Sequence, residues 1–236
     1  MTETDPTTDQ PQGDQPDGGG TDTTGTDTTG TDTTGTDTTG TDPGTTGGGG
    51  SASGSPVDVS YAVELIPQPD KLSCWAGSMS MLVGFRRQVS IPPEQVAEEA
   101  GQTLRRSYGW DELEAVRDHF GFVAVELPSN ASLYYDPPQW HQWLSTLGPL
   151  WVTTVGNPSH AIVVAGIHGD LTPDGTTVDI LNPWDTRASF DADEIDFHPD
   201  NGGYQYTQSF SAFAADFGNV GLALPSGDWR ILYLPG

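Results

Sequence analysis

A change of composition near Pro56–Val57 sets the strongest limit on what this chain can fold into. Residues 1–56 hold ten acidic residues, no lysine or arginine, and no large apolar side chain after Met1. Residues 21–40 repeat Thr-Asp-Thr-Thr-Gly four times, and this period is too short for a solenoid. Because such a segment cannot bury enough apolar surface to offset its ordering entropy, we expect residues 1–56 to be a disordered tail. It could serve as a flexible spacer, as an export or delivery tail, or as an introduced linker.

The other 180 residues, 57–236, are enough for one globular domain with a full core. They carry the remaining 23 acidic residues and all 8 basic ones, a net charge of −15. This acidity argues against nucleic acid and anionic membranes as partners, because both repel a negative protein. The single cysteine, Cys74, excludes an intramolecular disulfide and a cysteine-cluster zinc site. The acidic run 191–196 lacks calcium-loop spacing, so we expect no metal and no cofactor.

Localisation signals are absent from the sequence as given. No run of 18 apolar residues is present, so we expect no transmembrane helix. The first ten residues, MTETDPTTDQ, lack the basic and apolar regions of a Sec signal peptide. We therefore expect a protein that is cytoplasmic in the producing cell or is secreted by a route other than Sec.

Apolar periodicity predicts an α+β arrangement, because helical patterns come first and strand patterns follow. The expected helices are 74–87, 93–101, 110–120 and 138–147, with a short one at 209–217. The expected strands are 150–155, 161–166, 176–181 and 229–234, and we expect 57–66 to be a short strand or an extended entry segment.

Cys74 is the candidate nucleophile because it begins a predicted helix, with Ser73 as the expected N-cap. The unpaired N–H groups and the dipole at a helix start favour a thiolate over a thiol. Gln68 lies six residues earlier, where its amide and the Cys74 backbone N–H could both donate to an oxyanion. Trp75 follows directly. The alternative is that Cys74 is a small buried core residue.

His160 is the best placed of five histidines to act as the acid–base partner of the thiolate. It opens the run 161–166, which is apolar on both faces like a central strand. We expect His119 and His141 on helix surfaces, His168 in the turn region 168–175 and His198 in an acidic loop.

A hairpin around Pro173-Asp174-Gly175 would bring Asn182 beside His160. Paired residue numbers would then sum to about 342–343, which places His160 opposite Asn182 or a neighbour. The Asn182 amide oxygen could accept the imidazole N–H, and Trp184 could shield that bond from water. The alternative is a strand-ending Asn-Pro turn.

Together these motifs resemble the papain-like cysteine peptidases. The segments that carry the resemblance are 68–81 (QPDKLSCWAGSMSM), 148–152 (GPLWV), 160–169 (HAIVVAGIHG) and 181–184 (LNPW). The likeness is greatest to the compact bacterial branch, which includes the type III effector cysteine peptidases and the C39-like peptidases. His160 and Asn182 lie only 86 and 108 residues after Cys74, so the chain lacks much of the second half of the larger plant and lysosomal enzymes. Lys71 also stands where those enzymes have a disulfide-forming cysteine.

The resemblance implies a papain-like peptidase domain over 57–236, with an N-terminal helical half that carries the cysteine helix and a C-terminal antiparallel β half. Cys74, His160, Asn182 and Gln68 would be catalytic, with Trp75 and Trp184 in supporting roles. The compact branch often has Asp-Pro-Trp where this chain has Asn-Pro-Trp, so Asp185 is an alternative third member.

The expected function is a cysteine endopeptidase that cleaves a protein or peptide through a thioacyl-enzyme, with a bacterial secreted effector or toxin as its setting. A papain-fold amidase, deamidase or transglutaminase-type toxin is one alternative, and an inactive binding module is another. The expected protein is a monomer, with an immunity protein or a secretion machinery as further partners.

Overall fold

The computed structural model describes residues 56–104, 110–126, 136–154, 160–185, 201–218 and 231–236. The tail predicted over residues 1–56 lies outside these ranges except for Pro56. His198 and the acidic run 191–196 also lie outside the described residues.

The described residues form a mixed structure of helices and antiparallel strands, which confirms the α+β class. The elements follow in the order β1 (Val57–Ser60), α1 (Cys74–Arg87), α2 (Pro93–Glu99), α3 (Trp110–Phe120), β2 (Val123–Ala124), α4 (Pro137–Leu147), β3 (Leu150–Thr154), β4 (His160–Gly169), β5 (Thr176–Asn182), β6 (Tyr204–Ser209), α5 (Phe210–Gly218) and β7 (Ile231–Tyr233). The five expected helices are all present, with ends within a few residues of those expected. Glycines with positive φ follow two of them, Gly121 at 76° and Gly148 at 93°.

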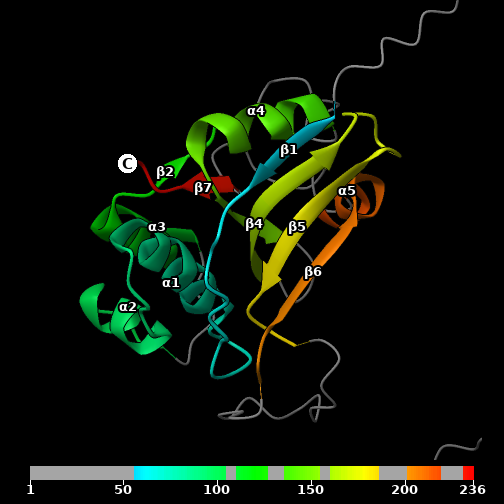
Figure 1. The fold of residues 1–236 in the computed structure, drawn as a ribbon. Coiled ribbons are helices and arrows are strands. Elements are labelled where there is room, and N and C mark those ends of the chain that lie inside the picture. The colour runs from blue at the N-terminus through cyan, green and yellow to red at the C-terminus, as the bar shows by residue number, and fades with distance from the viewer. Residues whose placement is uncertain (1–55, 105–109, 127–135, 155–159, 186–200, 219–230) are drawn as a thin grey trace, which may run out of the picture. The chain divides into compact units, whose positions relative to one another are not determined.

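All seven strands of the described residues belong to one sheet, and every pairing in it is antiparallel. Six of them follow the order β2-β7-β3-β4-β5-β6, and β1 lies off this path and pairs with β4. The long central strand β4 pairs with β5 along one edge (Figure 1). Its other edge pairs with β3 near its start and with β1 near its end. The two strands that sequence patterns missed are the two-residue β2 and the polar edge strand β6.

Alternate residues of β4 enter two different cores, which explains why its sequence is apolar on both faces. Ala161 and Val163 pack in the core that contains buried residues of α1, α2 and α3. Ile162 and Val164 pack in the core that contains buried residues of α4 and α5. Helices therefore cover both faces of this strand, and α1, α2 and α3 gather on one side of the sheet (Figure 1).

Helix α1 is more completely buried than its amphipathic pattern predicts. The nine residues from Trp75 to Val83 are all buried, including glycine and serine positions outside the expected apolar stripe. The reason is that α1 packs against β4 and β3 on one side and against α2 on another. The helix that begins with the only cysteine is thus held on several sides.

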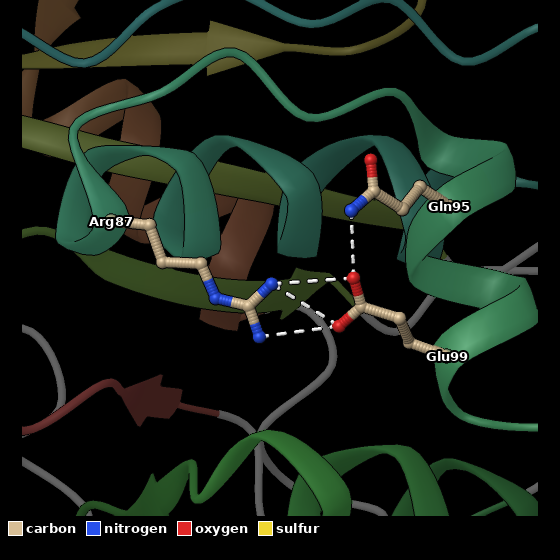
Figure 2. Close-up of polar contacts among 3 residues, drawn as sticks. All are labelled: Arg87, Gln95 and Glu99. Atoms are coloured by element: carbon tan, nitrogen blue, oxygen red, sulfur yellow. Dashed lines mark hydrogen bonds and ion pairs between the residues drawn. The ribbon is translucent and has the colours of Figure 1, made fainter.

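Arg87 links α1 to α2 at the end opposite Cys74 (Figure 2). Its guanidinium lies 3.1 Å from Glu99, which also accepts a 2.7 Å hydrogen bond from the Gln95 amide. The hydrogen bond from Gln95, together with Arg87, lowers the pKa of Glu99 below its ordinary value. Because this ion pair is exposed, we expect it to contribute only about 0–1 kcal/mol.

His168 corrects one expectation, because it lies within β4 rather than in the turn that follows. Its backbone pairs with Asp58 of β1 and Thr177 of β5. The turn predicted around Pro173-Asp174-Gly175 does connect β4 to β5.

Candidate active site

Cys74 is the first residue of α1, as the sequence predicts. Ser73 occupies the N-cap position, but its side chain makes no capping bond to the helix, which corrects the expected role. The Ser73 hydroxyl instead donates to the Asp70 carbonyl over 3.1 Å and accepts the Asp70 N–H over 3.3 Å. Ser73 therefore shapes the turn before the helix and leaves the N–H groups of the first helical turn without a side-chain cap.

Cys74 and His160 are hydrogen-bonded to each other, so the helix start and the strand start meet. Burial raises the pKa of Cys74, but the hydrogen bond and charge of His160 outweigh it, and the net pKa lies below its ordinary value. Backbone N–H groups of Ala161 and Trp75 lower it further. Burial lowers the pKa of His160, but Cys74 and then Asn182 raise it to a net value above the ordinary one. The pair therefore favours thiolate with imidazolium.

Asn182 fixes both the orientation and the tautomer of His160. Its Oδ1 lies 2.7 Å from His160 Nε2 and also accepts the backbone N–H of Trp184 over 2.9 Å. Since a backbone N–H can only donate, the Asn182 atom at this position must be the oxygen. His160 Nε2 must therefore carry a hydrogen, which leaves Nδ1 for the sulfur of Cys74.

The strand register differs from the expected one, although the predicted neighbours do meet. Paired residues of β4 and β5 sum to 344 or 345, because a bulge interrupts the ladder between Val164 and Gly166. Val163 pairs with Leu181, so His160 lies diagonally across from Asn182 rather than opposite it. A diagonal neighbour two residues away remains within reach of an imidazole ring.

Gln68 is buried and is held firmly at its backbone. Its N–H donates to the Pro183 carbonyl over 2.9 Å, so the Gln68 turn is joined to the residue after Asn182. Its side-chain Nε2 donates one hydrogen to the Asp70 carbonyl over 2.6 Å. Among the described residues its buried Oε1 accepts no hydrogen bond, which is uncommon for a buried polar atom.

Gly77, one turn along α1, allows these segments to approach the cysteine helix. A β-carbon at this position would lie 3.0 Å from the β-carbon of Pro183 and 3.2 Å from the backbone nitrogen of Gln68. Both are tighter than ordinary contacts, so only glycine fits here without displacing a neighbour. Sequence reasoning missed this residue, since a glycine inside a helical pattern signals close packing only in general terms.

A buried polar chain also supports the first turn of α1. The Trp151 indole N–H donates to the Ser78 hydroxyl over 2.7 Å, and that hydroxyl lies 2.7 Å from the Cys74 carbonyl. Trp151 and Ser78 are both fully buried, so each bond acts in a site from which water is excluded. Strand β3 thereby helps to hold the turn that carries the cysteine.

The remaining predicted site residues, Trp75, Trp184 and Asp185, lie close in the chain to Cys74 and Asn182. Trp75, the second residue of α1, is buried in the core, and Trp184 is half-buried and bonded to Asn182 through its backbone N–H. Asp185 donates its backbone N–H to the Asn201 side-chain oxygen over 2.9 Å. The His160 ring is hydrogen-bonded to the Asn182 side chain.

The other described histidines lie elsewhere. His119 is exposed, and its ring packs edge-on against Phe120, while His141 is half-buried on α4. His168 bridges two carboxylates, with Nδ1 2.7 Å from Asp58 and Nε2 2.7 Å from Asp179. Across the described ranges, no group of three or more His, Cys, Asp or Glu side chains could hold a metal ion. Within those same ranges, no helix has the length and apolarity needed to cross a membrane.

Residues 54–196 match the model of the family described as papain-like cysteine protease AvrRpt2. That stretch contains every candidate residue from Gln68 to Asp185. No curated protein matches the chain.

Proposed function

Because this chain belongs to the family of the papain-like cysteine protease AvrRpt2, and so is a cysteine-type peptidase, we propose that Cys74 is its nucleophile and His160 its acid–base group. The observation that carries the proposal is the continuous chain from Cys74 through His160 to Asn182. It supplies a polarised sulfur, a proton carrier and a group that orients the carrier.

In the proposed reaction, the thiolate of Cys74 attacks the carbonyl carbon of a peptide bond. A carbon–sulfur bond forms, and the electron pair of the carbonyl moves to oxygen. His160 then transfers its Nδ1 proton to the departing amine as the carbon–nitrogen bond breaks. Neutral His160 next accepts a proton from water as the water oxygen attacks the thioacyl carbon. The carbon–sulfur bond then breaks, which releases the carboxylic acid product and restores the Cys74 thiolate beside the His160 imidazolium.

We assign oxyanion stabilisation to Gln68 and the backbone N–H of Cys74. An amide nitrogen has two hydrogens, and the Asp70 carbonyl takes one of those on Gln68 Nε2. The second can be donated to the developing oxyanion, at an amide whose starting position is fixed by the backbone bond to Pro183. The Cys74 N–H belongs to the first helical turn, where backbone N–H groups have no intrahelical acceptor.

In this scheme Asn182 orients the imidazole, and Trp184 shields the bond between them from water. Trp75 supports α1 from the core, and Asp185 remains the alternative third member. The wider arrangement we propose is papain-like, with the cysteine helix packed against an antiparallel half. The domain boundaries that we propose are those expected from the sequence, a disordered tail over 1–56 and a peptidase domain over 57–236.

The proposed setting is a bacterial effector that cleaves a protein substrate, which fits the family. We propose that it acts as a monomer and reaches its target by a route other than Sec. An immunity protein or a secretion machinery would be its further partners.

The decisive experiment compares the products of wild-type protein and Cys74→Ala after incubation with a mixed proteome. Mass spectrometry should detect new peptide termini only with the wild type. Release of ammonia or amide transfer without new termini would support an amidase or transglutaminase reaction instead. Equal products from both proteins would refute Cys74 as the nucleophile.

A further inference from the structure

Asn201 lies outside the stretch matched by the family model, and its side chain joins both turns that carry the proposed site. It is 7% exposed. Its Nδ2 donates to the carbonyl of Gln68 over 2.6 Å and to the carbonyl of Pro183 over 2.9 Å. Its Oδ1 accepts the N–H of Asp185 over 2.9 Å and that of Gly203 over 3.2 Å. Both amide hydrogens and both lone pairs are thus used.

These bonds tie the Gln68 turn to the Asn182 turn. Gln68 is held there at both backbone groups, since its N–H bonds to Pro183 and its carbonyl bonds to Asn201. Gly203 has a φ of 66° and packs so closely that a β-carbon would lie 3.1 Å from the Asn182 carbonyl oxygen. On the other side, both turns pack closely against α1 at Gly77, where a β-carbon would lie 3.0 Å from the Pro183 β-carbon and 3.2 Å from the Gln68 nitrogen.

We propose that Asn201 is a positioning residue of the peptidase site, which holds the Gln68 turn against the Asn182 turn. It thereby fixes the position of Gln68, the proposed oxyanion donor, and of Asn182, which orients His160. This inference rests on the proposed function, because it concerns the same site. The four hydrogen bonds of the Asn201 side chain all go to backbone groups of neighbouring turns, so Asn201 acts on the sulfur and the imidazole through Gln68 and Asn182.

Only an amide of this length satisfies the four backbone groups. Two of them are carbonyls, which need donors, and two are N–H groups, which need acceptors. Aspartate has the same shape, but it would place an oxygen against the two carbonyls in a buried site. Serine can make part of the set without adding a charge. We therefore expect Asn201→Asp to disturb the site more than Asn201→Ser.

The first measurement gives kcat and KM on a fluorogenic peptide built around a cleavage site mapped for the wild-type protein. The second gives the rate of Cys74 alkylation by iodoacetamide at about pH 5.5. We expect Asn201→Asp to lower kcat by about 10–100-fold with KM within about threefold, and Asn201→Ser to lower kcat less. Alkylation at about pH 5.5 should slow in the same order, because a displaced Asn182 no longer orients His160. All assays are run on full-length chain at temperatures where circular dichroism shows each variant folded.

Tyr61→Phe is the matched control, since it removes a 2.7 Å hydrogen bond from the Tyr61 hydroxyl to the Leu144 carbonyl away from this site. It should lower the unfolding midpoint without changing kcat or alkylation. If folded Asn201 variants behave like Tyr61→Phe, Asn201 is merely structural and the inference is wrong. Should Asn201→Asp fail to fold, Asn201→Ser provides the same comparison.

A double-mutant cycle separates positioning from general damage. If Asn201 acts partly through Gln68, Asn201→Ser should lower kcat less in a Gln68→Ala background than in the wild type. Fully multiplicative losses would contradict the inference. The alkylation measurement needs no substrate, so it still tests Asn201 if the proteome experiment refutes peptide cleavage by Cys74.

Discussion

Oδ1 of Asn182 lies 2.7 Å from Nε2 of His160. This bond leaves the imidazole one free direction, toward the cysteine, and a neutral amide orients the ring without adding a third charge beside the thiolate and the imidazolium. Asn182 is itself 6% exposed, so the bond is largely protected from water.

Asn182→Ala should lower kcat/KM by about 10–100-fold, because His160 would sample orientations that do not face the sulfur. Asp185→Ala is the matched control and should leave kcat/KM within about threefold. The measurement is steady-state kinetics on the mapped peptide. A larger loss of kcat/KM in Asp185→Ala than in Asn182→Ala would identify Asp185 as the third member of the site.

Cys74 should alkylate rapidly with iodoacetamide at mildly acidic pH, since its net pKa lies below the ordinary value of a thiol. The rate should fall as pH drops through the lowered Cys74 pKa, because the thiolate becomes protonated. Peptidase activity should also fall as pH rises through the raised His160 pKa, where the leaving amine loses its proton donor. His160→Ala should move the alkylation midpoint upward, and an unchanged midpoint would disprove the ion pair.

Gln68→Ala should lower kcat by about 10²–10³, which corresponds to roughly 2.7–4 kcal/mol of transition-state stabilisation. KM should change little, because the oxyanion forms only in the transition state. Gln68→Glu should be worse, since a carboxylate would face the developing negative charge. Low-pH alkylation of Cys74 should persist in Gln68→Ala. A loss of kcat by only a few-fold would exclude Gln68 from the oxyanion site.

His168 should make the fold less stable as pH rises. Burial lowers the pKa of His168, but hydrogen bonds to Asp179 and Asp58 outweigh it and raise the net pKa above the ordinary value. The stabilisation is therefore complete below the unfolded value of about 6.5 and is lost as pH rises through the folded pKa. Urea unfolding across this range should show the loss in the wild type and a flatter profile in His168→Gln. The same dependence of the unfolding free energy on pH in the wild type and in His168→Gln would contradict this account.

Removal of residues 1–56 should leave the unfolding temperature and the turnover of the remaining chain unchanged, because the tail has no large apolar side chain after Met1 to contribute to a core. Differential scanning calorimetry and peptide kinetics on residues 57–236 test this directly. A clear drop in either quantity would mean that the tail interacts with the domain. Lost delivery with preserved turnover would instead support an export role.

Local sequence patterns were sufficient for most elements of the fold. The apolar run of β4 and the stop signals at Gly121 and Gly148 depend only on neighbouring residues, so they can be predicted without knowing the tertiary structure. The start of α1 at Cys74 was also predictable. Strand β6 was not, because Tyr204–Ser209 is rich in polar residues and is ordered by pairing with β5.

The sequence by itself also determined which residues we propose to carry the chemistry, since a lone cysteine at a helix start and a histidine at the mouth of an apolar strand are local features. Only the tertiary structure decided how they are held. The bulge near Gly166 shifts the register, Gly77 admits two turns against the helix, and Asn201 bonds those turns together. None of these roles leaves a local pattern, because each depends on the close approach of segments that are far apart in the chain.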